Sequence, residues 1–319
     1  MTLNLLPMKS DLRPISDEKW NVDVVVSELR QIRDRSLSAR QREGRHEKLP
    51  SRKHLASIIE HLGMAIFPNR LGVRDRAHGN IDYFVGHMLD VTLSQLAEEV
   101  LREFDFFDWQ RSDPAAHRER AVAVVRDFAA KLPAIRSLLE SDIRAAFEGD
   151  PAARSEDEVL VCYPGIHAIM HFRMAHELFR MGATLVARMI TEVAHSETGI
   201  DIHPGATIGG SFFIDHGTGV VIGETAVIGE HVRIYQAVTL GAKRFPTDED
   251  GVLLKGNARH PLVEDGVVIY AGATILGRVT IGRDSVIGGN VWLTSSVPPG
   301  SNVSQAKVRR ESFDAGSGI

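Results

Sequence analysis

A histidine and its acidic neighbour are the residues best suited to acid–base chemistry. His216 directly follows Asp215 and precedes Gly217, and glycine leaves room for a substrate beside the imidazole. Imidazole titrates near neutral pH, so His216 could act as a general base. The alternative is a histidine that only occupies a turn. Asp201 could orient such an imidazole and stabilise its charge, although sequence spacing does not establish that contact.

Arg259 and His260 form a second candidate pair at the end of a long polar segment. The guanidinium of Arg259 suits bidentate recognition of a carboxylate. The alternative is an ordinary solvated loop. Glu224 follows a glycine of the same region. It is either part of a substrate site or an outward-facing polar residue.

Metal and phosphate sites are not expected from the motifs. His167 and His171 are four residues apart on a predicted helix and share a face. Ala168 stands where H-E-x-x-H has its glutamate, so we expect a packing role and no metal. No other histidine or cysteine group has zinc-ligand spacing, and no glycine-rich phosphate loop occurs. The single cysteine, Cys162, excludes an intrachain disulfide and is expected to be a buried apolar residue.

The candidate residues lie in or beside a hexapeptide repeat. Of the 28 glycines, 18 lie between Gly199 and Gly300, where aliphatic residues recur every six positions. Six is not a helical period; it fits three short strands per triangular coil, with glycine, asparagine or aspartate at the corners. We predict a left-handed parallel β-helix of four to five coils over residues 199–300. The repeat positions are Ile202, Ile208, Ile214, Ile222, Ile228, Ile234, Leu240, Val263, Ile269, Ile275, Ile281, Ile287 and Leu293.

Two interruptions of this repeat hold the candidate side chains. A two-residue slip between Ile214 and Ile222 contains Asp215 and His216, and an insertion at 242–261 ends with Arg259 and His260. Loops on a rigid scaffold commonly carry binding and catalytic residues.

Residues 1–198 are predicted to be an α-helical domain. Apolar residues recur at helical spacing over 52–67, 83–104 and 166–195. Asp113 and Pro114 begin a further helical segment that reaches residue 147 and is broken near Pro133. Gly199 suits the exit from the last segment. Residues 1–50 are expected to be a solvated helix or a mobile arm, and 301–319 a C-terminal tail.

Composition excludes several classes. The chain has 319 residues, a formal net charge of −5 and 25% charged residues, which argues against a whole-chain footprint for nucleic acid or an anionic membrane. No apolar stretch of about 18 residues occurs, so we expect no transmembrane helix. The N-terminus lacks the pattern of a signal peptide. A cytoplasmic location is therefore expected.

The motifs resemble serine O-acetyltransferase, in its longer-armed bacterial and plant-like branch. They are D-I-H-P-G-A-T-I-G from Asp201, F-I-D-H-G-T-G-V-V-I-G-E-T from Phe213, A-V-T-L-G from Ala237 and R-H-P from Arg259. The resemblance extends back to G-D-P-A from Gly149 and covers about residues 149–300. It implies transfer of the acetyl group of acetyl-CoA to L-serine, which gives O-acetyl-L-serine for cysteine biosynthesis.

The resemblance also implies residue roles. His216 would take the proton from the serine hydroxyl, whose oxygen attacks the thioester directly, without a covalent enzyme intermediate. Asp201 would orient His216. Asp150 and Asp215 would help to hold the substrate amino acid, with Asp150 facing the ammonium group. Arg259 and His260 would hold the carboxylate, and Glu224 is a further substrate-binding candidate.

In the resembled family, CoA lies in the groove between neighbouring β-helices of a trimer. The matching small residues here are Gly241, Ala242, Ala271 and Gly289. Gly241 is followed by Ala242-Lys243-Arg244 in place of the family's usual G-G-T-G-K. The resemblance implies a homotrimer or a hexamer built as a dimer of trimers, and no metal. The C-terminal Ile319 is of the type that this family inserts into O-acetylserine sulfhydrylase.

Two other functions stay open at this point. One is a hexapeptide-repeat O-acetyltransferase that acts on a sugar or another hydroxyl acceptor. The other is a non-catalytic scaffold that binds the sulfhydrylase. A γ-type carbonic anhydrase shares the β-helix but needs three metal-binding histidines on adjacent coils, and the sequence shows no such set.

Overall fold

The computed structural model describes residues 20–39, 49–72, 81–108, 113–243 and 256–305. The chain divides into two compact units, Met1–Glu47 and Lys48–Ile319, each described by itself. In the first unit, α1 (Val22–Ala39) has exposed side chains at all positions whose exposure is described. A solvated helix, one of the two alternatives for the N-terminal segment, is what occurs there.

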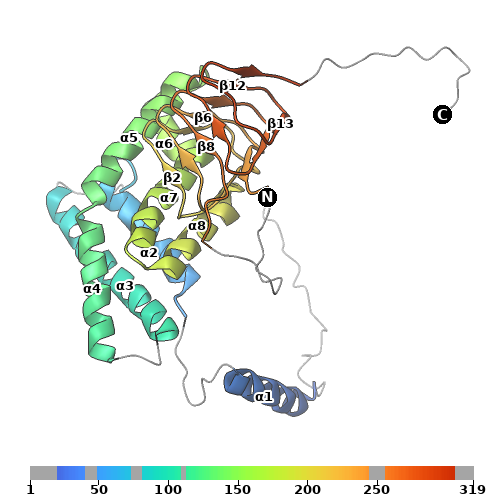
Figure 1. Ribbon diagram of the computed structural model, residues 1–319. Helices are drawn as coiled ribbons and strands as arrows, with labels where there is room; N and C mark the ends of the chain where they lie inside the picture. The colour runs from blue at the N-terminus through green and yellow to red at the C-terminus, as the bar shows by residue number, and fades with distance from the viewer. Residues whose placement is uncertain (1–19, 40–48, 73–80, 109–112, 244–255, 306–319) are drawn as a thin grey trace, which may run out of the picture. The chain divides into compact units, whose positions relative to one another are not determined.

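Among the described residues of the second unit, seven helices precede the strands (Figure 1). The predicted segments 52–67 and 83–104 and the break near Pro133 are confirmed, and Asp113 caps its helix by accepting a hydrogen bond from the backbone N–H of Ala115 at 3.0 Å. Gly199 ends the last helix in the left-handed conformation, with φ of +70°. The helices are α2 (Arg52–Ile66), α3 (Ile81–Phe107), α4 (Pro114–Ala129), α5 (Leu132–Gly149), α6 (Glu156–Cys162), α7 (Pro164–Arg180) and α8 (Thr184–Thr198).

Three details differ from the sequence predictions. The short helix α6 was not expected; it begins at Ser155, whose side chain accepts a hydrogen bond from the N–H of Glu158. The expected segment 166–195 is divided at Gly182, whose φ of +91° stops α7. The prediction that Cys162 is buried is wrong: it lies at the exposed end of α6. Within the described ranges, no helix combines the length and apolar character that a membrane span requires.

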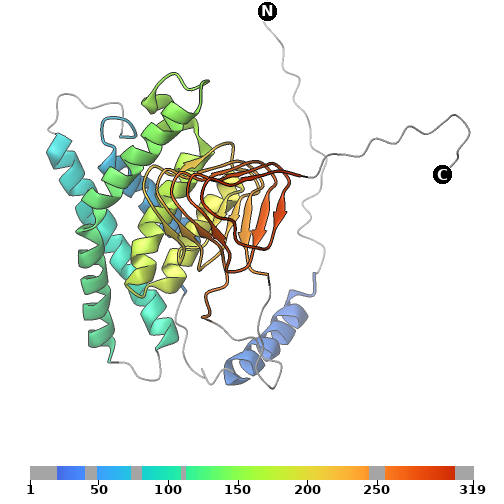
Figure 2. The same cartoon turned by 45° about the horizontal axis from the view of Figure 1, so that its top comes forward.

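Fourteen short parallel strands among the described residues form a three-sided β-helix (Figures 1 and 2). Sheet A has the order β1-β4-β7-β10-β13, sheet B has β2-β5-β8-β11, and sheet C has β3-β6-β9-β12-β14. The strands are β1 (Asp201–Ile202), β2 (Thr207–Ile208), β3 (Phe213–Ile214), β4 (Val221–Ile222), β5 (Val227–Ile228), β6 (Arg233–Ile234), β7 (Thr239–Gly241), β8 (Leu262–Val263), β9 (Val268–Ile269), β10 (Thr274–Leu276), β11 (Thr280–Ile281), β12 (Val286–Ile287), β13 (Trp292–Leu293) and β14 (Asn302–Val303).

The predicted repeat positions build the core. All thirteen aliphatic residues are buried and stand at the second position of a strand, so they point inward while the first residue faces outward. They stack in register: on sheet A, for example, Ile202 pairs with Ile222, and Ile222 with Leu240. The expected fold class, a helical region followed by a parallel β-helix of hexapeptide repeats, is confirmed.

Two edges of the three-sided β-helix carry the candidate residues. The C–A corner consists of the turns that join sheet C to sheet A, at 215–220, 235–238, 270–273 and 288–291. The A–B corner consists of the turns that join sheet A to sheet B, at 203–206 and 223–226, the described parts of 242–261, and 277–279. Sheet A separates the two corners.

The helices are tied to the first coil by a buried ion pair. Arg173 of α7 donates from Nε and Nη2 to the two carboxylate oxygens of Asp142 on α5, at 2.6 and 2.8 Å. Arg173 Nη2 also donates to the carbonyl of Gly209, at 2.8 Å, and the N–H of Phe212 donates to Asp142 at 2.9 Å. This network fixes α5, whose C-terminal end carries Asp150, on the β-helix.

Candidate active site

His216 lies on the C–A corner with its side chain 72% exposed. Its φ of +59° places it in the left-handed region, which non-glycine residues rarely adopt. Ala237 and Asn290, in the turns of later coils, share this conformation, so the corner itself demands it. The result is an imidazole held outward on a rigid turn, where a substrate can reach it.

Asp215 sits beside this imidazole and is itself anchored. Arg233 Nη2 donates to Asp215 Oδ2 at 2.8 Å, and Asp215 Oδ1 lies 3.9 Å from His216 Nε2. The guanidinium of Arg233 lies over the rings of Phe213 and Tyr235, with its Cζ 4.9 and 4.8 Å from the ring centroids. Because Asp215 is nearly buried, Arg233 offsets its charge and fixes its direction.

Asp150 approaches the same corner from the helical region. Tyr163 donates its hydroxyl proton to Asp150 Oδ2 at 2.5 Å. This bond is the main reason that the pKa of Asp150 is below its usual value, and it raises the pKa of Tyr163 to about 12. The charges of Arg233 and His216 lower the pKa of Asp150 further, so both lie within electrostatic reach. Asp150 is therefore a carboxylate at neutral pH.

Two glycines permit this close approach. A Cβ atom at Gly149 would lie 3.0 Å from the ring of Phe213. A Cβ at Gly165 would collide with the carbonyl oxygen of Ile214. These glycines let the end of α5 and the start of α7 pack against β3, which brings Asp150 and Tyr163 to the C–A corner.

Arg259, His260 and Glu224 gather on the A–B corner instead. Arg259 Nη2 donates to Glu224 Oε2 at 2.7 Å. Thr225 Oγ1 accepts from the backbone N–H groups of Arg259 and His260 at 2.9 and 3.2 Å. Thr225 thus holds the end of the insertion onto the coil, and Glu224 orients the guanidinium.

The ring of His260 has a defined tautomer. Its Nδ1 accepts from the backbone N–H of Thr225 at 3.0 Å, which leaves the proton on Nε2. Burial, followed by the charge of Arg259, lowers the pKa of His260 to about 4, so the ring is neutral. The ring lies directly over Gly223, where any Cβ would collide with it. His260 can therefore offer a neutral N–H donor beside the Arg259 cation.

Asp201 does not contact His216 in a single chain. It stands on β1 at the outer side of sheet A, and Arg188 Nη1 of α8 donates to its Oδ1 at 3.3 Å. Its part in orienting His216 stays a prediction.

The four predicted CoA residues divide between the two corners. Ala271 and Gly289 stack on the C–A corner, where the N–H of Asn290 donates to the carbonyl of Ala271 at 2.9 Å. Gly241 ends β7 and Ala242 follows it, on the A–B corner. A cavity of about 290 Å³ lies nearby, lined by Lys243, Arg259 and Leu276 among others.

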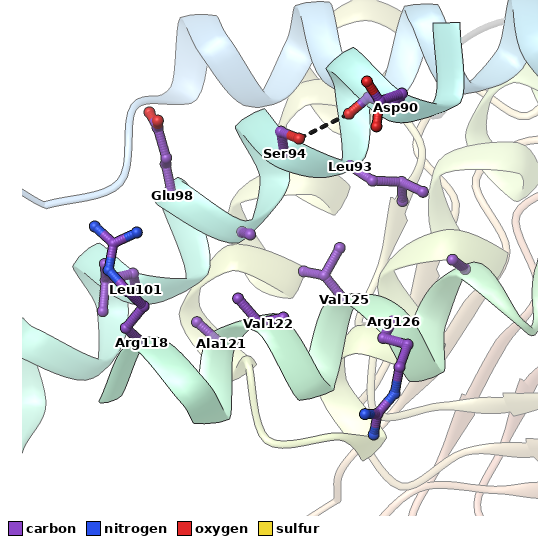
Figure 3. A pocket seen from close by; sticks show the side chains of 12 residues that line it. Asp90, Leu93, Ser94, Glu98, Leu101, Arg118, Ala121, Val122, Val125 and Arg126 are labelled. Carbon is purple, nitrogen blue, oxygen red and sulfur yellow. Dashed lines mark hydrogen bonds between the residues drawn. The ribbon is translucent and has the colours of Figure 1, made fainter. Parts of the chain in front are cut away.

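A larger hollow lies away from both corners. A groove of about 420 Å³ lies between α3 and α4. Figure 3 shows its lining, in which Leu93, Val122 and Val125 lie among charged side chains. It contains none of the candidate residues.

Comparison with known proteins shows the family to which this chain belongs. Residues 260–295 match the family described as bacterial transferase hexapeptide (six repeats). A serine acetyltransferase of Synechococcus elongatus is 52% identical over 97% of this chain and 99% of its own. One from Mycobacterium tuberculosis is 51% identical over 52% of this chain and 68% of its own.

Solved structures show the same relationship. Serine acetyltransferase isoform 3 of Entamoeba histolytica, in complex with cysteine, superposes with a TM-score of 0.68 at 34% identity, over 85% of this chain and 87% of that one. The Neisseria gonorrhoeae enzyme in complex with serine gives a TM-score of 0.52 at 27% identity, over 80% of this chain and 96% of that one. The chain belongs to the serine acetyltransferase family, acyltransferases of the hexapeptide-repeat superfamily.

Proposed function

We propose that His216 is the general base with which this serine acetyltransferase moves the acetyl group of acetyl-CoA to the hydroxyl of L-serine. The observation that carries the proposal is the C–A corner, where an exposed imidazole stands beside the Asp215–Arg233 pair and within electrostatic reach of Asp150. O-Acetyl-L-serine made in this way feeds cysteine biosynthesis.

The reaction needs one base and no covalent enzyme intermediate. His216 takes the hydroxyl proton as the serine oxygen bonds to the thioester carbonyl carbon. The carbon–sulfur bond then breaks, the electron pair leaves with sulfur, and the proton on the imidazolium passes to the CoA thiolate. Asp215, 3.9 Å from the imidazole, stabilises the imidazolium while it carries the proton.

The amino acid is bound through both of its charges. Asp150 and Asp215 face the C–A corner as carboxylates and hold the ammonium group. Arg259 and the neutral N–H of His260 hold the carboxylate. Glu224 keeps Arg259 in place through their 2.7 Å ion pair.

In one chain, the ammonium-binding carboxylates lie on the C–A corner and the carboxylate-binding residues lie on the A–B corner. A face of the coil spans about five or six residues at ~3.3 Å each, whereas the two charged groups of serine share one carbon atom. The complete site therefore forms where the C–A corner of one chain meets the A–B corner of another. A repeated head-to-tail contact of this kind closes into a ring, and three chains make the homotrimer.

Two further observations support this assembly. The CoA residues divide in the same manner, with Ala271 and Gly289 on one corner and Gly241 and Ala242 on the other. Sheet A, between the corners, carries Val221 and Trp292 with exposed apolar side chains, 38% and 70% accessible. A neighbouring chain would cover such a surface. The helical region, residues 1–198, would serve assembly, including a hexamer made of two trimers.

Release of the CoA thiol tests the function. We expect release with acetyl-CoA and L-serine but not with galactosides, and His216→Ala should lower kcat by about two to four orders of magnitude. His231→Ala is the matched control, because His231 is exposed, has φ of +57° and lies on a turn between sheets B and C. Release with sugars alone, or near-normal turnover in His216→Ala, would contradict the proposal. If no acceptor leads to thiol release and the chain binds O-acetylserine sulfhydrylase tightly, the result would favour a non-catalytic scaffold.

A further inference from the structure

The helical region contains a cavity that the acetyl transfer does not use. It has a volume of about 680 Å³ and lies between α2, α7, α8 and the end of α6. Most of its lining is apolar, including Leu71, Met170 and Val193. Five titratable side chains face it: Lys53, Glu60, His167, His171 and Glu197.

Three of these side chains converge at one point. His167 Nε2 and Glu197 Oε2 are 2.7 Å apart, and the rings of His167 and His171 lie with their centroids 4.4 Å apart and their planes tilted by 45°. One ligand atom from each of the three side chains lies within 4.8 Å of the other two. The histidines come from consecutive turns of α7, and Glu197 comes from the last turn of α8.

The buried histidine is already oriented. His171 Nδ1 donates to the backbone carbonyl of His167 at 2.9 Å, which leaves the lone pair on Nε2. Metal-binding histidines are oriented in this way, with the second ring nitrogen donating to a carbonyl or carboxylate.

We propose that His167, His171 and Glu197 bind a divalent transition-metal ion of the Zn²⁺ type, with an open coordination position toward the cavity. Two imidazoles and one carboxylate are an established ligand set for such ions, and a fourth position is then left for water.

The geometry is close to what coordination needs. Ligand atoms at 2.0–2.1 Å from a tetrahedral Zn²⁺ are about 3.3 Å apart, within the 4.8 Å bound seen here. His167 and Glu197 are about half exposed, so they can adjust and give the ion access from solvent, while His171 is the fixed ligand. Glu60 adds a second negative charge to the cavity and Lys53 one positive charge.

The sequence spacing alone favoured helix packing for the histidine pair, because it shows no third ligand. The third ligand is 26 residues beyond His171, on the next helix, and only the fold brings it in. A packing role and a metal site differ in one respect: packing does not depend on the Glu197 carboxylate.

Zinc binding to the metal-stripped full-length protein tests the proposal. We expect one Zn²⁺ per chain by equilibrium dialysis and elemental analysis, and Co²⁺ should give the visible absorption of a tetrahedral site. Glu197→Gln and His167→Ala should each weaken binding at least tenfold. Both positions are partly exposed, so these variants should fold, and acetyl transfer by Glu197→Gln should stay within about twofold of wild type.

A second cluster of metal-ligating side chains provides the control. Glu192, His195 and Asp201 also place ligand atoms within 4.8 Å of one another. His195→Ala should keep the full stoichiometry. Absence of stoichiometric binding, unchanged affinity in Glu197→Gln, or loss of binding in His195→Ala would each overturn the proposed site.

Discussion

The division of the site between two corners predicts that defective chains will complement one another. His216→Ala removes the base from the C–A corner, and Arg259→Ala removes the carboxylate-binding cation from the A–B corner. If each site takes one corner from each of two chains, a trimer that contains both variants can hold a site with both residues intact. Such a site needs the Arg259→Ala chain to supply His216 and the His216→Ala chain to supply Arg259.

The magnitude follows from the geometry. In a cyclic trimer that contains both variants, about one interface in three combines the two intact corners. Alone, His216→Ala should retain about one part in 10²–10⁴ of the activity. Arg259→Ala loses charge-assisted hydrogen bonds to the substrate, which costs roughly 10- to 150-fold. The mixed trimer should therefore show about a third of wild-type activity per chain, against a background of at most about 5%.

The assay is thiol release by the two variants produced together, each with its own affinity tag and purified in tandem. A mixture of His216→Ala with Asp215→Ala is the control, because both changes damage the same corner and no interface is repaired. Activity of the first mixture that does not exceed the sum of its components would refute the shared site. The two corners would then have to act within one chain.

Three further predictions concern single features. Tyr163→Phe removes the hydrogen bond that most lowers the pKa of Asp150, so that pKa rises and the acid limb of kcat/KM for serine should move to higher pH. Asp142→Ala leaves the Arg173 cation buried without its partner and should lower the free energy of unfolding by about 3–5 kcal/mol in a denaturant titration. Deletion of Ile319, which lies outside the described residues, should abolish binding to O-acetylserine sulfhydrylase in a pull-down and leave thiol release unchanged.

The β-helix was predictable because its sequence pattern is local and periodic. Each coil repeats one inward aliphatic per face, so the period alone locates Ile222 or Ile287 in the core before any contact is known. The slip at 215–220 was visible as two extra residues in the same count. The position of a residue in the repeat also determines which sheet it belongs to and whether its side chain points inward or outward.

The helical region was predictable in part. The apolar spacing of residues 52–66 was long enough to identify α2 and its buried face. The helix α6 has seven residues, too few for a periodic pattern, and its start depends on the cap at Ser155. Gly182 interrupts an otherwise continuous pattern, and a lone glycine within a helix is compatible with either a break or a continuous helix.

The candidate site shows the limit of reasoning from neighbours in the chain. His216 and Asp215 are adjacent in sequence and remain adjacent in space, but Arg233, the partner of Asp215, is one coil later. It could have been found, because β3 pairs with β6 and sets Arg233 opposite Phe213, two residues before Asp215. The contact of Tyr163 with Asp150 could not have been found from the sequence, because it depends on how the helices pack against the first coil.

The corners also explain why residues of one cluster are far apart in the sequence. Glu224 and Arg259 are separated by 35 positions yet form one ion pair, because the turn at 223–226 and the described end of the insertion both lie on the A–B corner. His216 is only eight positions from Glu224, but the face of sheet A lies between them. A β-helix thus sorts its residues by corner. Under the proposed assembly, serine, which is smaller than one face, is held by two chains that each supply one corner, so substitutions at the interface should also change the active site.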